Sequence, residues 1–206
     1  MLCSRVVSLF LVFGILVPAA LLPQKASAAA AYVISDNTTG VVLDRVAGDK
    51  KLQIGSLTKI ATAMVVLDWQ ASTNADLSQL ATVPAYSAAL SSTAGVGFQP
   101  GDQCSVRDLI YAAMMQSDNI AAETLAHHVG RGLAGGGQAP VQTFVQQMNA
   151  LAKSKGMLRT RFLNAHGLDT LERALPFSTA EDCAKLAAYA MSNSAFRFYV
   201  SQKERK

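Results

Sequence analysis

The stretch QIGSLTKIATAMVVL, residues 53–67, places a serine and a lysine three positions apart at the head of an almost unbroken apolar run. The run predicts a helix from Ser56 to about Gln70. This helix is apolar nearly all round, which is typical of a helix buried in a core rather than one laid on a surface. Because lysine is rarely buried without a partner, a lysine in the first turn of such a helix indicates a function for the cation.

Ser56 and Lys59 are expected to share one helix face, since residues i and i+3 lie within reach of each other. A neutral hydroxyl is a weak nucleophile and needs a nearby base. Partial burial and the positive end of the helix dipole would lower the pKa of the lysine, so that a neutral amine can accept the serine proton. The same short pattern also fits an N-cap serine followed by a solvated lysine.

A second motif, Ser117-Asp118-Asn119, lies between two predicted helices. The pairing of S-x-x-K with S-D-N is typical of penicillin-binding proteins and class A β-lactamases. In this interpretation Ser117 relays a proton between the lysine and the leaving group, and Asn119 binds a substrate amide. The alternative for this motif is an ordinary helix-capping turn.

The chain resembles the serine-type D-Ala-D-Ala carboxypeptidases, which are low-molecular-mass penicillin-binding proteins of peptidase family S11. The stretches that carry the resemblance are GSLTKIATA (55–63), LIYAAMMQSDNIAAETLAHHVG (109–130), FVQQMNALAKSKGMLRTRFLNAHGL (144–168) and FSTAEDCAKLAAYAM (177–191). The resemblance implies that the enzyme removes the terminal D-alanine from peptidoglycan stem peptides. Ser56 would form the acyl-enzyme, Lys59 would be the base, and Ser117 and Asn119 would complete the site. β-Lactams would acylate Ser56 as substrate mimics, and no metal or organic cofactor is implied.

The sequence departs from the family pattern in two places. Asp118 stands where the family usually has glycine or alanine. No K-T-G, K-S-G or H-T-G triad occurs in the chain, and KSKG (153–156) falls at the end of a predicted helix. The resemblance places the third motif on a strand beyond Lys206, where it supplies a cation and an oxyanion donor. We therefore expect a truncated family member with little or no activity, because losing one oxyanion donor costs roughly 10²–10³ in rate.

The expected fold is α/β (α+β), a β-lactamase/transpeptidase-like sandwich of helices on an antiparallel sheet, truncated at the C-terminus. Two β-prone runs around a turn predict a hairpin. Serine or threonine three residues ahead of an acidic residue predicts two helix starts, after Ser105 and after Thr179. The predicted elements are strands at 32–35 and 41–44 and helices near 106–115, 120–129, 141–155 and up to about Met191. A polar, small-residue stretch at 71–103 ends in a turn.

Residues 1–28 have the features of a secretory signal peptide: Arg5, an apolar segment, and a small-residue site cut before Ala29. An uncleaved membrane anchor is the alternative. Cleavage leaves a penicillin-binding domain at 29–206 that is exported to the periplasm or the exterior. No other apolar segment approaches a membrane span. Cleavage also lowers the formal net charge of +4 by two, and the remaining scattered charges exclude the basic patch of a nucleic-acid binder.

Three alternatives to a carboxypeptidase remain open. A class A β-lactamase would need a deacylating E-x-x-L-N motif, but ERALP (172–176) has proline in the last position. A D,D-endopeptidase of the same family and a non-catalytic wall-binding remnant are the others. Cys104 and Cys183 could pair after export or remain as two free thiols. We expect His166 to be structural, since serine–lysine chemistry needs no imidazole.

Overall fold

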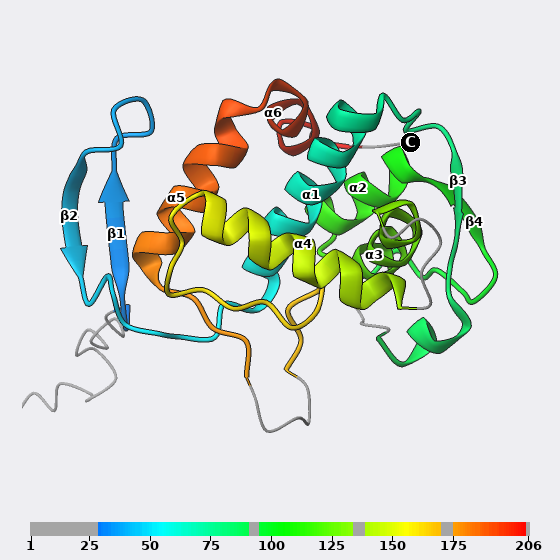
Figure 1. Ribbon diagram of the computed structural model, residues 1–206, viewed down its shortest axis with the longest axis horizontal. Helices are drawn as coiled ribbons and strands as arrows, with labels where there is room; N and C mark the ends of the chain where they lie inside the picture. The colour runs from blue at the N-terminus through cyan, green and yellow to red at the C-terminus, as the bar shows by residue number, and fades with distance from the viewer. Residues whose placement is uncertain (1–28, 91–94, 134–138, 170–174, 205–206) are drawn as a thin grey trace, which may run out of the picture.

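The computed structural model describes residues 29–90, 95–133, 139–169 and 175–204 of the 206-residue chain (Figure 1). The strands are β1 (Tyr32–Ser35), β2 (Val42–Val46), β3 (Leu80–Thr82) and β4 (Gln103–Ser105). The α-helices are α1 (Thr58–Thr73), α2 (Val106–Met115), α3 (Asn119–Leu133), α4 (Pro140–Ser154), α5 (Ala180–Ser192) and α6 (Ser194–Val200). Two 3-10 helices, η2 (Gly55–Leu57) and η3 (Ala85–Leu90), complete the set. The predicted signal peptide and most of ERALP lie outside the described residues.

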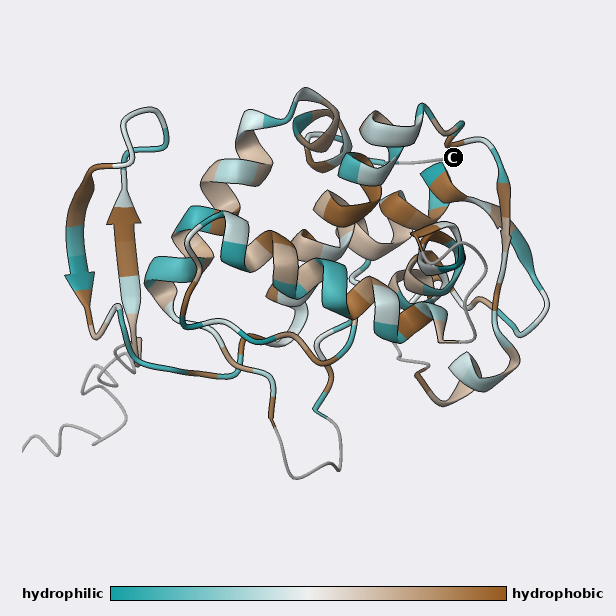
Figure 2. Ribbon diagram, in the orientation of Figure 1, coloured by the Kyte–Doolittle hydropathy of each residue, from teal (hydrophilic) through white to brown (hydrophobic). Residues whose placement is uncertain are grey.

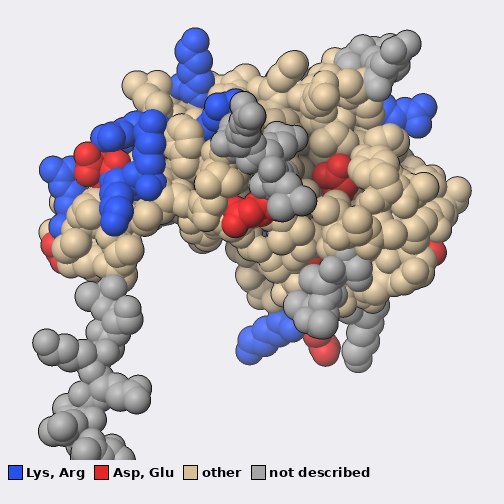
Figure 3. All heavy atoms as spheres, turned by 90° about the horizontal axis from the view of Figure 1, so that it is seen from below, with Lys and Arg blue, Asp and Glu red and all other residues tan. Residues whose placement is uncertain are grey.

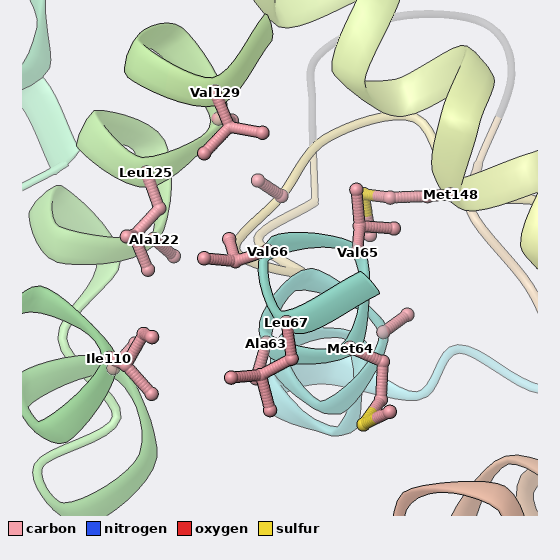
Figure 4. Close-up of a cluster of buried hydrophobic side chains, with 14 of the residues drawn as sticks. Ala63, Met64, Val65, Val66, Leu67, Ile110, Ala122, Leu125, Val129 and Met148 are labelled. Atoms are coloured by element: carbon pink, nitrogen blue, oxygen red, sulfur yellow. The ribbon is translucent and has the colours of Figure 1, made fainter. Parts of the chain in front are cut away.

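Helix α1 forms the centre of the core, as the apolar run predicted. Its side chains from Ala61 to Leu67 are buried, and they meet residues of α2, α3 and α4 such as Ile110, Leu125 and Met148 (Figure 4). In Figure 2 the hydrophobic colour is strong on α1 and α2 in the middle of the molecule, whereas α4 alternates between hydrophilic and hydrophobic residues. The predicted start is wrong by two residues, because the α-helix begins at Thr58 and Ser56 lies in the preceding 3-10 turn.

The serine and the threonine that were predicted to cap helices both do so in the structure. The Ser105 hydroxyl accepts a hydrogen bond from the Asp108 N–H at the start of α2. Thr179 accepts one from the Asp182 N–H at the start of α5. These bonds satisfy amides that have no partner within the helix, which explains why both helices begin where the sequence indicated.

The sheets are antiparallel and small. β1 pairs with β2 from Tyr32↔Val46, and β3 pairs with β4 from Leu80↔Ser105. The hairpin was predicted, and the mixed α/β class with antiparallel strands is confirmed. No element was predicted in the polar, small-residue stretch 71–103, which holds the end of α1, β3, η3 and the first residue of β4. Helix α6 was not predicted either.

The β1–β2 hairpin lies at one end of the molecule, beside α5 (Figure 1). Seen from below, most Lys and Arg side chains of that face gather at this end, with acidic side chains among them (Figure 3). The ion pair from Arg45 to Glu181, 2.7 Å, joins β2 to α5. A largely exposed ion pair thus connects the hairpin to the helical body.

Two other expectations can be compared with the described residues. Cys104 in β4 and Cys183 in α5 are free thiols, so the structure does not contain the disulfide that export would allow. Among the described helices, none is long and apolar enough to cross a membrane.

Candidate active site

The candidate nucleophile lies on a turn that leads into the buried helix. Ser56 is exposed, whereas Lys59, three residues later, is only 2% exposed. In this 3-10 turn the Leu57 N–H already donates to the Ile54 carbonyl. The Ser56 N–H precedes it and belongs to the first helical amides, which have no partner within the helix. It is therefore available to an incoming oxyanion.

The Lys59 amine contacts three oxygens. Its Nζ lies 3.1 Å from the Ser56 hydroxyl, 2.8 Å from the Asn119 side-chain carbonyl and 2.8 Å from the His166 backbone carbonyl. The last two oxygens can only accept hydrogen bonds. A neutral amine has two N–H groups and one lone pair. When both N–H groups point to Asn119 and His166, the lone pair is directed at the serine.

The surroundings of Lys59 favour this neutral amine. Burial lowers the pKa of the lysine to about 8, and the negative charge of Asp118 opposes that shift. Taking an ammonium group out of water disfavours its charged form, and here the nearby carboxylate only partly compensates. A pKa close to the physiological range is suited to a general base.

Asp118 fixes the start of α3 and therefore the position of Asn119. One oxygen of the buried carboxylate accepts from the Ala121 N–H, and the other accepts from the Val96 N–H, at 2.8 and 2.7 Å. The Asn119 amide donates to the Leu90 carbonyl at 3.3 Å, which leaves its oxygen for Lys59. Asp118 is thus a structural residue within the motif.

Ser117 is the predicted site residue that the structure does not join to the others. It is exposed, and among the described residues it forms no hydrogen bond with Ser56 or Lys59. Its φ of 54° is unusual for a residue with a side chain. Such backbone strain is often found at functional sites, where surrounding contacts hold it in place.

The segment 164–168 also lines the site, because the His166 carbonyl contacts the Lys59 amine. The Asn164 side chain accepts from the His166 and Gly167 amides and so shapes the loop. Gly167 has a φ of 83°, and a Cβ there would lie 1.9 Å from the Gly55 carbonyl oxygen. The absence of a side chain at Gly167 therefore lets the loop lie directly against the turn that carries Ser56.

Sequence reasoning missed two groups near the lysine. The first is the backbone carbonyl of His166. Every residue has such a carbonyl, so the residue type does not predict this contact. The second is Glu123 on α3, whose buried carboxyl lies 4.0 Å from the His166 ring. The available signal was an acidic residue four positions after Asn119, among the mostly apolar residues of the first half of α3. No group of side chains suited to a metal ion occurs within the described part of the chain.

Comparison with known proteins identifies the family of the chain. The family of D-alanyl-D-alanine carboxypeptidases, peptidase S11, matches residues 19–206. The chain belongs to this family. The resemblance inferred from the sequence motifs is therefore confirmed.

Relatives within the S11 family have different names. The chain is 33% identical to the D-alanyl-D-alanine carboxypeptidase of Streptomyces sp. (strain K15), with 90% of this chain and 62% of that protein covered. It is 35% identical to a D-alanyl-D-alanine endopeptidase of Pseudomonas aeruginosa, with 82% and 50% covered. A solved mutant of the Streptomyces K15 DD-transpeptidase has a TM-score of 0.74 at 33% identity, with 87% and 67% covered. The chain thus spans less than two thirds of the length of these two curated relatives.

Proposed function

We propose that the chain carries the acylation site of a serine-type D-Ala-D-Ala carboxypeptidase that acts on peptidoglycan stem peptides. One observation carries this proposal. The buried Lys59 amine reaches the Ser56 hydroxyl while two acceptors occupy its remaining hydrogen-bonding positions. Membership of the S11 family supplies the substrate class.

The first half-reaction follows from this arrangement. Lys59 takes the proton of the Ser56 hydroxyl, and the serine oxygen bonds to the carbonyl carbon of the penultimate D-alanine. The Ser56 N–H donates to the oxyanion that develops on the substrate. As the C–N bond breaks, the departing D-alanine amine receives the proton by way of Ser117. Asn119 holds the substrate amide, and water later hydrolyses the serine ester to release the shortened peptide.

The same site would react with β-lactams, which acylate serine through their strained amide and remain attached. We propose that the mature part of the chain begins at Ala29 and that it works outside the cytoplasmic membrane, where peptidoglycan is found. Release of D-alanine requires both acylation of Ser56 and hydrolysis of the resulting ester. Acylation and turnover therefore need separate measurements.

Intact-mass spectrometry of the folded chain with benzylpenicillin tests the proposal. We expect one covalent adduct on the wild type, mapped to Ser56 by peptide digestion, and none on Ser56→Ala. A folded wild-type chain that gains no mass after prolonged incubation would contradict the acylation site. Binding to cell-wall sacculi that persists in Ser56→Ala, without D-alanine release, would instead support the non-catalytic alternative.

A D,D-endopeptidase is the second candidate, favoured by the relative of that name in Pseudomonas aeruginosa. Release of D-alanine from a pentapeptide supports the carboxypeptidase, whereas cleavage of a cross-linked muropeptide dimer supports the endopeptidase. Rapid turnover of a chromogenic cephalosporin would favour the β-lactamase alternative, because a carboxypeptidase remains acylated.

A further inference from the structure

Glu123 is a buried acid that the acylation mechanism does not use. It lies on α3 four residues after Asn119, and its side chain is 8% exposed. Within the described part of the chain, its Oε2 has no hydrogen-bond partner. Buried polar atoms without a partner are uncommon in folded proteins, so this one calls for an explanation.

The atom that faces this carboxyl can be identified. His166 Nδ1 accepts a hydrogen bond from the Leu168 N–H, at 3.1 Å. The neutral ring therefore carries its proton on Nε2, and Nε2 lies 4.0 Å from Glu123 Oε2. Burial, with the positive charge of Lys59, lowers the pKa of His166 to about 4, so this tautomer is present at physiological pH. A small rotation of either side chain would bring the N–H and the carboxyl oxygen to hydrogen-bond distance.

His166 connects Glu123 to the catalytic lysine. The ring faces Glu123, while the backbone carbonyl of the same residue accepts from Lys59 Nζ. Asn119, the other acceptor, shares a face of α3 with Glu123, because i and i+4 lie one above the other. Helix α3 therefore acts on both oxygens that orient the amine. It reaches one directly through Asn119 and the other through the Glu123–His166 contact.

We propose that Glu123 is a positioning residue, which holds the His166 ring and thereby keeps the His166 carbonyl in place to orient the Lys59 amine. The proposal rests on the proposed function, since it assigns a role in Ser56 acylation. Tyr86 of η3 is a further titratable group near Glu123. Burial raises the pKa of Glu123, and hydrogen bonding to Tyr86 of η3 opposes the rise.

The first test compares acylation rates for the full chain. Glu123→Leu removes the acceptor, and we expect benzylpenicillin acylation of Ser56 to fall by about ten- to a hundredfold, as small misplacements of reacting groups do. Glu123→Gln keeps an oxygen for the Nε2 proton and should restore most of the rate. Thr124→Val is the matched control, because Thr124 is the next residue of α3 and also has a buried oxygen without a partner among the described residues. It should acylate like the wild type.

The second test does not depend on activity. Nitrogen NMR of His166 should show a proton on Nε2 in the wild type, with a shift that changes as Glu123 ionises. Glu123→Gln should remove that change, and Thr124→Val should keep it. An unchanged Nε2 titration in Glu123→Gln, or equal acylation by Glu123→Leu and the wild type, would overturn the positioning role. Failure of the wild type to acylate at all would instead refute the proposed function, and with it the link from this pair to catalysis.

Discussion

The Lys59 side chain can be buried because each hydrogen-bonding position of its amine has a partner. A buried ammonium group without partners is strongly unfavourable, and burial therefore tends to deprotonate it. Here Asn119 and His166 provide oxygens for both the charged and the neutral forms. The site thus retains an amine that changes its protonation state near neutral pH, without losing the hydrogen bonds that orient it.

The pH dependence of acylation follows from the lysine. In the proposed mechanism the neutral Lys59 amine is the base. Since its pKa is about 8, we expect the second-order rate of Ser56 acylation to rise with pH and to level off above about 8. Quenched labelling with fluorescent penicillin over a range of pH on both sides of that value measures this profile. Lys59→Arg should be inactive throughout, because guanidinium stays protonated. A rate that is independent of pH would contradict the role of Lys59 as base.

Asp118 should tune this profile. Its negative charge raises the pKa of Lys59, so Asp118→Asn should move the acylation midpoint to lower pH. The asparagine side chain also has only one acceptor oxygen, whereas the Val96 and Ala121 N–H groups each need one. We therefore expect a loss of about 1–3 kcal/mol of stability. Urea unfolding and the labelling profile measure the two effects.

Asp182 offers the matched control for this change. It is buried to a similar degree, but it lies on α5 and contacts the Arg159 N–H and the Lys185 amine. Asp182→Asn should lower stability by a similar amount while leaving the acylation midpoint in place. If both variants shifted the midpoint equally, a general loosening of the fold would explain the result better than the local charge.

At the scale of elements, the site depends on how the 164–168 loop lies against the Ser56 turn. Gly167→Ala should introduce both an unfavourable φ and an overlap with the Gly55 carbonyl. Gly156 is a suitable control, because it also has a positive φ, 69°, but a Cβ added there would have no atom within 4 Å. We expect roughly 1–2 kcal/mol of destabilisation at Gly156, from the backbone conformation. The free energy of unfolding of the Gly167→Ala variant should fall by about 1–3 kcal/mol more, because the added methyl group overpacks this contact.

Only the change at Gly167 should also slow acylation, because only that loop carries the His166 carbonyl. Thermal unfolding gives the stability difference, and penicillin labelling gives the rate. Equal labelling by the two alanine variants would show that the loop position matters less to the lysine than the geometry indicates.

The elements that the sequence predicted well have strong local signals. Helix α1 is marked by its apolar run, and α2 and α5 are marked by Ser105 and Thr179 as caps. The strands β3 and β4 have three residues each, which is too short for an alternating pattern to distinguish them from a loop. Their pairing joins segments that are well separated in the chain, and it cannot be predicted from a local sequence pattern.

The candidate site was predictable to the extent that side chains define it. Ser56, Lys59 and Asn119 were found from two short motifs, and the structure brings them together. The His166 carbonyl could not be found in this way, because any residue could supply it. Asn119 was expected to bind substrate, whereas its contact with Lys59 emerged only from the packing of α1 against α3.

At the scale of the whole molecule, stability is unevenly distributed. Helix α1 is surrounded by other helices, while Leu43 in the hairpin is 67% exposed. A two-stranded hairpin contributes little stability by itself. Since amides exchange through the lowest-energy opening that exposes them, the buried helix and the hairpin should belong to different opening units.

Native-state hydrogen exchange should therefore separate these units. We expect the β1–β2 amides to exchange first and the amides of α1 around Val65 to exchange last, through global unfolding. Leu125→Ala removes a fully buried side chain that packs near α1, at a cost of about 2–5 kcal/mol. It should accelerate exchange in α1 while leaving the hairpin rates unchanged, because the hairpin already opens without the core. Equal acceleration of both regions would mean that hairpin and core unfold as one unit, and that the ion pair between Arg45 and Glu181 couples them more tightly than exposed charges usually do.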